Sequence, residues 1–156
     1  MLRRVCVAML VLASVVGLCA TAEIVTLVAG QQYDAGWVTA VADDDSLKVT
    51  IHADNGWVLL ETHVYVGLIP PTKSAPGRFP FKHESLDGAL SDSYEISLDG
   101  LGVACEDTLY VAVHAVVFGE ENEYGEETAW GNGSVIREKK NWAMVFEVFV
   151  DCGGTR

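Results

Sequence analysis

Residues 47–66 read LKVTIHADNGWVLLETHVYV, and this stretch decides the fold class. Residues 47–53 alternate between apolar and polar side chains, which is the period of a half-buried β-strand. Residues 57–66 form a longer run of β-branched and aromatic side chains, which fit the pleated surface of a sheet. Asp54, Asn55 and Gly56 separate the two runs, and an Asn-Gly step in this setting is a strong hairpin signal.

Similar runs occur on both sides of this stretch. They cover residues 24–28, 37–41, 94–98, 109–118 and 143–150. Because turn residues separate them, we expect residues 37–41, 47–53 and 57–66 to form an antiparallel meander. No segment shows the apolar period of a helix. The pattern therefore favours an all-β fold, an antiparallel β-sandwich of the immunoglobulin-like or jelly-roll-like kind.

Two long loops are expected to interrupt the strands. Residues 67–93 contain all four prolines of the chain, and proline cannot donate a hydrogen bond to a strand ladder. Residues 119–134 are acidic and rich in glycine. Loops of this length in a small domain commonly carry function, so both are candidate binding regions.

Residues 1–22 have the three parts of a secretory signal peptide. Arg3 and Arg4 form the charged part, residues 5–18 are apolar, and Ala20-Thr21-Ala22 has the spacing of a cleavage site. We expect cleavage before Glu23 and a single secreted, extracellular domain of residues 23–156. A lipoprotein signal at Cys19 and a membrane anchor are the alternatives, although the apolar run is shorter than the roughly 20 residues that span a bilayer.

The charge balance narrows the classes of partner. The chain carries 10 basic and 22 acidic residues, a formal net charge of −12. Removing the two arginines of the expected signal peptide leaves 8 basic and 22 acidic residues, a net charge of −14. Such a protein repels phosphates, so we expect no nucleic-acid partner and no docking on anionic lipid. No later segment is long and apolar enough to be a membrane span in the mature chain.

Cys105 and Cys152 are the two cysteines that follow the expected signal peptide. An even pair in an oxidising compartment predicts a disulfide, and closing so long a loop stabilises a fold by about 4 kcal/mol in the chain-entropy model. A metal site built on the two cysteines is the weaker alternative, because the chain has no C-x-x-C spacing.

Four blocks of the sequence occur in a characteristic order. They are WVLLETHVYVG at 57–67, APGRFPFKHE at 75–84, CEDTLYVAVHAVV at 105–117 and EETAW at 126–130. In this order they resemble a module that recurs in secreted and cell-surface proteins of microbes, alone behind a signal peptide or within larger surface proteins. The resemblance covers most of residues 35–151. It implies an extracellular all-β domain and no particular activity.

One set of histidines and glutamates suggests metal chemistry. Its members are Glu61, His63, His83, Glu84, His114 and Glu127. Glu61 and His63 share one face of an expected strand, and His114 interrupts an apolar run. If the strands face each other, Glu61, His63 and His114 would suit zinc, copper or non-haem iron. The alternatives are structural hydrogen bonding of buried polar groups, and a small secreted hydrolase that uses Glu61 and Glu127 with His63 or His114.

The acidic segments suggest calcium. Asp43, Asp44 and Asp45 are consecutive, and a second acidic cluster comprises Glu120, Glu121, Glu123, Glu126 and Glu127. Calcium binds six to eight oxygen atoms, often in loops of extracellular modules. The sequence contains no EF-hand pattern, however, and a solvated hairpin tip explains the three aspartates equally well.

The tryptophans suggest a ligand surface. Trp57 and Trp142 begin expected strands and are expected in the core, whereas Trp130 lies in the acidic loop. Trp130 is therefore the candidate for an exposed aromatic platform, with Glu126 and Glu127 beside it and His83 on the other long loop. An aromatic side chain that holds the loop against the domain is the alternative.

The sequence contains no G-x-S-x-G elbow and no other sharp catalytic motif. We expect a non-enzymatic secreted or cell-surface module that recognises a surface glycan or protein through the two long loops. The alternatives are a calcium- or transition-metal-binding extracellular domain, holding a calcium or zinc ion, and a small secreted hydrolase.

Overall fold

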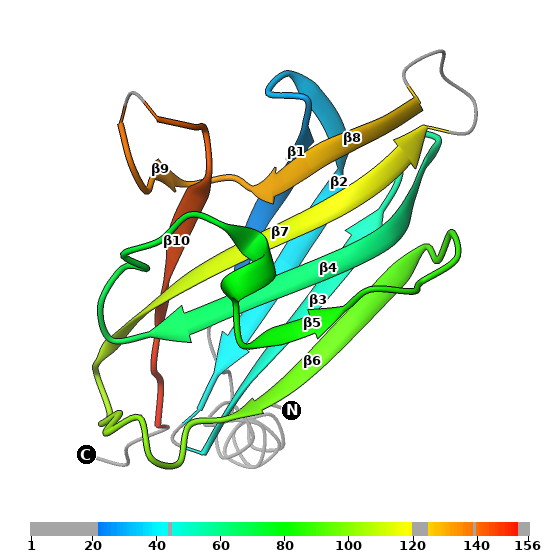
Figure 1. Cartoon of the computed structure of the whole chain (residues 1–156). Coiled ribbons are helices and arrows are strands. Elements are labelled where there is room, and N and C mark those ends of the chain that lie inside the picture. Colours follow the sequence, from blue (N-terminus) through cyan, green and yellow to red (C-terminus); the bar gives the residue numbers. More distant parts are fainter. Residues whose placement is uncertain (1–21, 44, 120–124, 139, 153–156) are drawn as a thin grey trace, which may run out of the picture.

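The computed structural model describes residues 22–43, 45–119, 125–138 and 140–152, and these form an all-β domain (Figure 1). The described residues contain ten strands and one short 3-10 helix. The elements are β1 Ala22–Ala29, β2 Tyr33–Ala42, β3 Ser46–Ala53, β4 Trp57–Gly67, η1 Pro76–Arg78, β5 Phe81–His83, β6 Ser91–Ser97, β7 Thr108–Gly119, β8 Gly125–Gly131, β9 Ser134–Val135 and β10 Met144–Phe149. Each run expected to be a strand is a strand.

The strands form one antiparallel sheet in the order β5-β4-β7-β8-β1-β2-β3-β6, with β10 paired to β7 and β9 paired to β10. The sheet curls until its end strands, β5 and β6, come close together, so that it nearly closes into a barrel (Figure 1). The all-β and antiparallel parts of the prediction are confirmed. A sandwich of two separate sheets is not confirmed, because β8 pairs with both β7 and β1 and joins the two halves.

The expected meander is correct for β2 and β3 and wrong for β3 and β4. Asn55 and Gly56 adopt the positive φ angles, 56° and 81°, that a tight turn requires. After this turn, however, β4 pairs with β5 and β7 rather than with β3. Residues 86–90 lie between the two strand ends, where Leu90 O accepts from Ala53 N and Ala89 O from Leu59 N. Because β4 is buried on both faces, it takes a position in the covered half of the sheet.

A β-bulge at Leu60 changes which side chains of β4 face the core. The register shifts between Leu59 and Glu61, which lie opposite consecutive residues of β7. Leu59 therefore packs in the core with Val64, while His63 faces outward. Simple alternation places Leu59 on the same face as Glu61 and His63, and the extra residue of the bulge reverses that order.

The two expected loops contain more regular structure than predicted. Residues 67–93 include η1, β5 and the start of β6, and the expected loop at 119–134 includes β8. Residues 120–124 lie outside the described part of the chain. The sequence of β8, GEETAWG, has little strand propensity of its own, so its pairing with β7 and β1 makes it a strand.

Two apolar clusters lie on opposite sides of the sheet. The main cluster fills the barrel interior, where side chains such as Leu27, Ile51 and Val113 have no exposed surface. The second cluster lies outside β7 and β8, where Phe79 of the proline-rich segment packs with Trp130 and its neighbours. The proline-rich segment therefore covers part of the outer face of the sheet.

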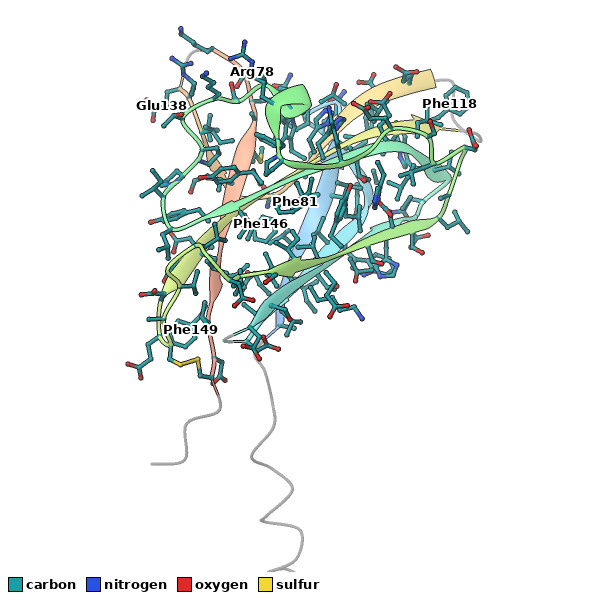
Figure 2. All side chains as sticks on the ribbon, turned by 60° about the horizontal axis from the view of Figure 1, so that its bottom comes forward. Arg78, Phe81, Phe118, Glu138, Phe146 and Phe149 are labelled. Atoms are coloured by element: carbon teal, nitrogen blue, oxygen red, sulfur yellow. A yellow bond between two sulfur atoms is a disulfide. The ribbon has the colours of Figure 1, made fainter. Side chains whose placement is uncertain are left out.

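Cys105 and Cys152 form the predicted disulfide, which joins the segment before β7 to the segment after β10. Figure 2 shows it near Phe149, at the end of β10. The expected signal peptide lies outside the described residues except for Ala22, which begins β1. Within the described ranges, no helix has the length and hydropathy needed to cross a membrane.

Candidate functional site

His63 and His114 meet on the outer face of the β4–β7 pair. They are direct cross-strand partners, and their Nδ1 atoms are 3.1 Å apart. At this distance one Nδ1–H donates to the other Nδ1, and the tautomers of the two rings decide which of them is the donor. On the far side of His63, Nε2 lies 3.7 Å from Oε1 of Glu84 and 4.0 Å from Oε2 of Glu61. The expected approach of two imidazoles and two carboxylates is present.

The electrostatics of this pair are governed by burial. Burial, together with a smaller contribution from repulsion by His63, lowers the pKa of His114 from 6.5 to about 3. The indole of Trp130 packs edge-on against the His114 ring, with centroids 4.9 Å apart. His114 is therefore neutral at physiological pH, and its ring nitrogens act as a hydrogen-bond donor and acceptor.

The structure adds no further candidate ligand to the proposed metal site among the described residues. Within the described ranges, no three His, Cys, Asp or Glu side chains are grouped so that they could hold a metal ion. Glu61 and Glu84 are 41% and 54% exposed, and both approach the same nitrogen of His63. What the arrangement does directly is to satisfy two buried imidazoles by hydrogen bonding, and a metal at Glu61, His63 and His114 stays a prediction.

Asp43, the first of the three consecutive aspartates, begins a turn. Oδ1 of Asp43 accepts hydrogen bonds from the backbone N–H groups of Asp45 and Ser46, at 2.9 and 2.6 Å. These two backbone donors lower the pKa of the Asp43 carboxyl. Asp44 and the acidic residues 120, 121 and 123 lie outside the described part of the chain. Asp43 thus stabilises the β2–β3 hairpin tip.

Trp130 is buried, so the hypothesis of an exposed platform is wrong and the alternative, a side chain that holds the loop against the domain, is confirmed. Trp130 lies in β8 and is 3% exposed. Phe79 covers it, with ring centroids 6.1 Å apart, and Tyr65 packs on the other side of Phe79 at 5.9 Å. The side chain holds the proline-rich segment against the sheet, because this burial removes several large apolar surfaces from water.

The other expected ligand residues do not gather around Trp130. Glu126 shares its face of β8 but lies at the far end, opposite Phe118. Glu127 projects to the opposite face, where its Oε2 lies next to Gly30. His83 faces β6. Trp130, Glu126, Glu127 and His83 therefore do not form one site.

The same alternation separates the two carboxylates of the hydrolase hypothesis. Glu61 lies opposite Val116, whereas Glu127 lies opposite the next residue of β7, Val117. Successive residues of a strand project to opposite faces, so the sheet stands between Glu61 and Glu127. That pair is not a catalytic pair.

A polar cluster joins β4 and β5 to β6, where the barrel nearly closes. The Thr62 hydroxyl donates to Asp92, and the Tyr94 hydroxyl lies 2.7 Å from Oγ1 of Thr62 and 3.1 Å from its carbonyl oxygen. Nδ1 of His83 lies 2.9 Å from Oδ2 of Asp92, and its ring stacks on Tyr94 at 4.5 Å. Burial raises the pKa of Tyr94 to about 12. These contacts connect strands that no ladder joins within the described residues.

Trp37 is an exposed aromatic side chain on a sheet face, and the sequence pattern did not distinguish it from the other tryptophans. Trp37 is 39% exposed and stacks on its cross-strand partner His52, with ring centroids 4.9 Å apart and an interplanar angle of 24°. Gly36 allows the close approach, because a Cβ there would lie 2.0 Å from His52 O. The stack restrains the indole on the outer face of β1, β2, β3 and β6.

Hydroxyl groups surround this stack in register. One row across the four strands is Thr26, Trp37, His52 and Ser91, and the next is Ile24, Thr39, Thr50 and Ser93. A third row ends in Lys48 beside Glu95, whose charges oppose each other. The sequence signal for this face was the polar side of the alternating 47–53 run, but its importance depends on which strands become neighbours.

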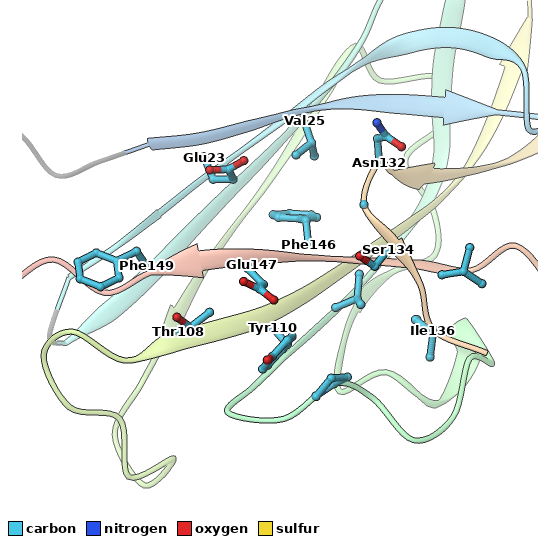
Figure 3. A pocket seen from close by; sticks show the side chains of 14 residues that line it. Glu23, Val25, Thr108, Tyr110, Asn132, Ser134, Ile136, Phe146, Glu147 and Phe149 are labelled. Carbon is cyan, nitrogen blue, oxygen red and sulfur yellow. The ribbon is translucent and has the colours of Figure 1, made fainter. Parts of the chain in front are cut away.

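A groove with a volume of about 780 Å³ lies between β1 and β10 (Figure 3). Val25 and Phe146 project into it, and Tyr110 and Phe149 line it from the outer face. Glu23 and Glu147 are the charged residues among its lining side chains. No sequence pattern pointed to this groove, because its walls are strands that are far apart in the chain.

The chain matches no protein-family model, no curated protein and no solved structure in the comparisons. The geometry of these surfaces is therefore the basis on which a function is inferred.

Proposed function

We propose that this protein is a non-catalytic module that acts outside the cell and binds a neutral surface glycan on the Trp37 face, defined as the outer face of β1, β2, β3 and β6. The observation that carries the proposal is the exposed Trp37 indole stacked on His52. A restrained indole offers a flat apolar platform to the C–H face of a sugar ring, at little entropic cost on binding.

The surroundings of Trp37 favour a neutral ligand over a charged one. The chain has a net charge of −12, yet the rows beside the stack carry hydroxyl side chains: Thr26, Thr39, Thr50, Ser91 and Ser93. Hydroxyls donate and accept hydrogen bonds, as sugar hydroxyls do. The charged side chains in the three rows described above are Lys48 and Glu95, which lie beside each other with opposite charges.

The extracellular location is part of the same proposal. It is supported by the disulfide between Cys105 and Cys152, since such bonds persist in oxidising compartments. The export signal in residues 1–22 and the strongly acidic composition agree with it.

The test is binding of the oxidised protein to a panel of soluble neutral polysaccharides, namely mannan, laminarin, xyloglucan and dextran, by calorimetry and affinity electrophoresis. At least one should bind and change the tryptophan fluorescence. Trp37→Ala should weaken that binding by roughly tenfold or more, as for an aromatic hot spot.

Phe118→Ala is the matched control, because Phe118 is 40% exposed against 39% for Trp37 and lies on the outer face of the other half of the sheet. Figure 2 shows it at the opposite end of the molecule from Phe149. This variant should bind as the native protein does. The proposal is wrong if no neutral polysaccharide binds, or if Trp37→Ala and Phe118→Ala weaken binding equally.

A further inference from the structure

The walls of the groove between β1 and β10 are two strand edges that are only partly paired in the described residues. β1 pairs with β8 only from Leu27 to Ala29, so residues 22–25 have a ladder on one side alone. β10 pairs with β7 along residues 146–149, whereas its other edge meets β9 at residues 144 and 145 and is bridged to Ala42 of β2 at Val150, so the unpaired stretch lies between these contacts. The barrel is therefore open along this line.

The backbone groups of Ile24 point into this opening. Thr26 O accepts a hydrogen bond from Asn132 N, which places the Thr26 backbone groups on the β8 side of β1. Backbone groups of residues two apart point to the same side of a strand, so the N–H and C=O of Ile24 face the groove.

Glu147 supplies the opposite wall by the same argument. Val150 bonds to the β7 side, through Val150 N to Asp107 O and Glu106 N to Val150 O. Residues at odd separation from Val150 direct their backbone groups the other way, so the N–H and C=O of Glu147 face the groove.

The side chains around the opening define the chemistry of a guest. Val25 and Phe146 form an apolar floor, and Phe149 is 49% exposed at the rim. Glu23 and Glu147 add two carboxylates, and no basic side chain is among the lining residues. An unpaired edge with an apolar floor favours an extended peptide, and the carboxylates favour a basic one.

We propose that the groove between β1 and β10 binds an extended peptide segment of a partner protein, with alternating apolar and basic side chains, which adds a strand to the open side of the barrel. The open stretch of residues 22–25 accommodates about four residues of such a strand, at roughly 3.3 Å per residue. The guest N–H and C=O groups pair with Ile24 or Glu147, its apolar side chains contact Val25 and Phe146, and its cations approach Glu23 and Glu147. This inference is independent of the glycan face, which lies on the other side of β1.

The probe is an alternating lysine–valine heptapeptide, titrated into the oxidised protein by fluorescence anisotropy at low salt. We expect saturable one-to-one binding. A glutamate–valine heptapeptide of the same length should bind at least tenfold more weakly, because it would bring like charges to the rim. Glu147→Gln should weaken binding of the basic peptide by roughly two- to fivefold, the size of an exposed charge pair.

The backbone is tested by a matched pair of variants at one position. Ile24→Pro removes the groove-facing N–H and leaves the ladder to β2 intact, whereas Ile24→Ala keeps that N–H and removes only an outward side chain that is 64% exposed. Binding should fall at least fivefold in Ile24→Pro and stay unchanged in Ile24→Ala. If Ile24→Pro does not fold, N-methylation of alternate amides of the peptide tests the same hydrogen bonds. Methylating the set of amides that faces the protein should abolish binding, and methylating the other set should not.

Several outcomes overturn the proposal. If the acidic and basic peptides bind with equal affinity, the carboxylates do not select the guest. If N-methylation of neither set of alternate amides changes the affinity, the peptide does not add as a strand. Displacement of the peptide by a neutral oligosaccharide assigns the groove to a glycan. Concentration-dependent dimerisation that Ile24→Pro abolishes, without peptide binding, assigns it to a second copy of the chain.

Discussion

The nearly closed barrel has two seams, and they are constructed in opposite ways. Where β6 meets β4 and β5, side-chain hydrogen bonds and a ring stack connect the strands. The residues that make these contacts are Thr62, Asp92, Tyr94 and His83. Where β10 faces β1, no ladder joins the two strands within the described residues, and a groove of about 780 Å³ lies between them. We call these the closed seam and the open seam.

The difference separates stability from recognition. Buried polar groups at the closed seam must keep their partners, because an unsatisfied one costs about 1–3 kcal/mol. Backbone groups of the open seam that have no partner among the described residues can pair with a ligand without breaking a native contact. We therefore expect substitutions at the closed seam to change folding and substitutions at the open seam to change binding.

Loss of the disulfide should cause the largest change in the free energy of unfolding among the variants that compare the two seams. Replacing Cys105 and Cys152 by serine should lower the free energy of unfolding by about 4 kcal/mol, because a loop spanning 47 positions is no longer closed in the unfolded chain. Urea unfolding measures the loss. Hydrogen exchange should show β10 opening before β6, since the bond holds the end of β10 beside the open seam. Equal protection of both strands would contradict this order.

Lowering the pH tests the ladder of β4 and β7, where His114 pairs with His63. The folded pKa of His114 is about 3 against 6.5 for the free side chain, so the unfolded state takes up a proton first as the pH falls. Its contribution to stability is complete above about pH 6.5 and declines toward pH 3, by about 1.4 kcal/mol per pH unit at the steepest. Unfolding curves at successive pH values measure it. His114→Gln should flatten the decline, and an unchanged slope would show that another group causes it.

Thr62→Val tests the closed seam directly. The substitution keeps the shape of the side chain but removes the hydroxyl that contacts Asp92 and Tyr94, so we expect a loss of about 1–3 kcal/mol in urea unfolding. Thr62→Ser retains the hydroxyl and is the control, with a much smaller loss. A stability equal to that of the native protein in Thr62→Val would mean that the polar cluster does not hold the seam.

Phe149→Ala at the open seam should have the smallest effect. The side chain is 49% exposed, so its removal should change the free energy of unfolding by no more than about 0.5 kcal/mol. The same variant should weaken binding of the lysine–valine peptide. A large loss of stability without a change in binding would reverse the roles that we assign to the two seams.

Much of the local structure followed from periodicity and turn chemistry. The runs at 47–53, 57–66 and 109–118 are strands, and Cys105 pairs with Cys152. The approach of His63 to His114 was only conditional, because it required the pairing of β4 with β7 that the pattern left open. In contrast, β8 was missed, because GEETAWG becomes a strand through its neighbours rather than through its own propensity.

Exposure was the property that local sequence could not determine. Trp130 and Trp37 both lie among polar or small residues, yet Trp130 is 3% exposed and Trp37 is 39% exposed. Phe79, from a distant segment, covers Trp130, and no described segment covers the face that carries Trp37. Burial depends on contacts between distant residues, which an alternating pattern does not encode.

By itself, then, the sequence determined that the chain is all-β, where most strands lie, which cysteines join and that the net charge is strongly negative. These properties depend on near neighbours along the chain and on composition. Only the tertiary structure decided that β4 leaves β3 for β7, that Glu61 and Glu127 lie on opposite faces, and that one seam is closed and the other open. Strand pairing and closure are set by how the whole apolar surface is buried at once, and a local pattern is compatible with several such arrangements.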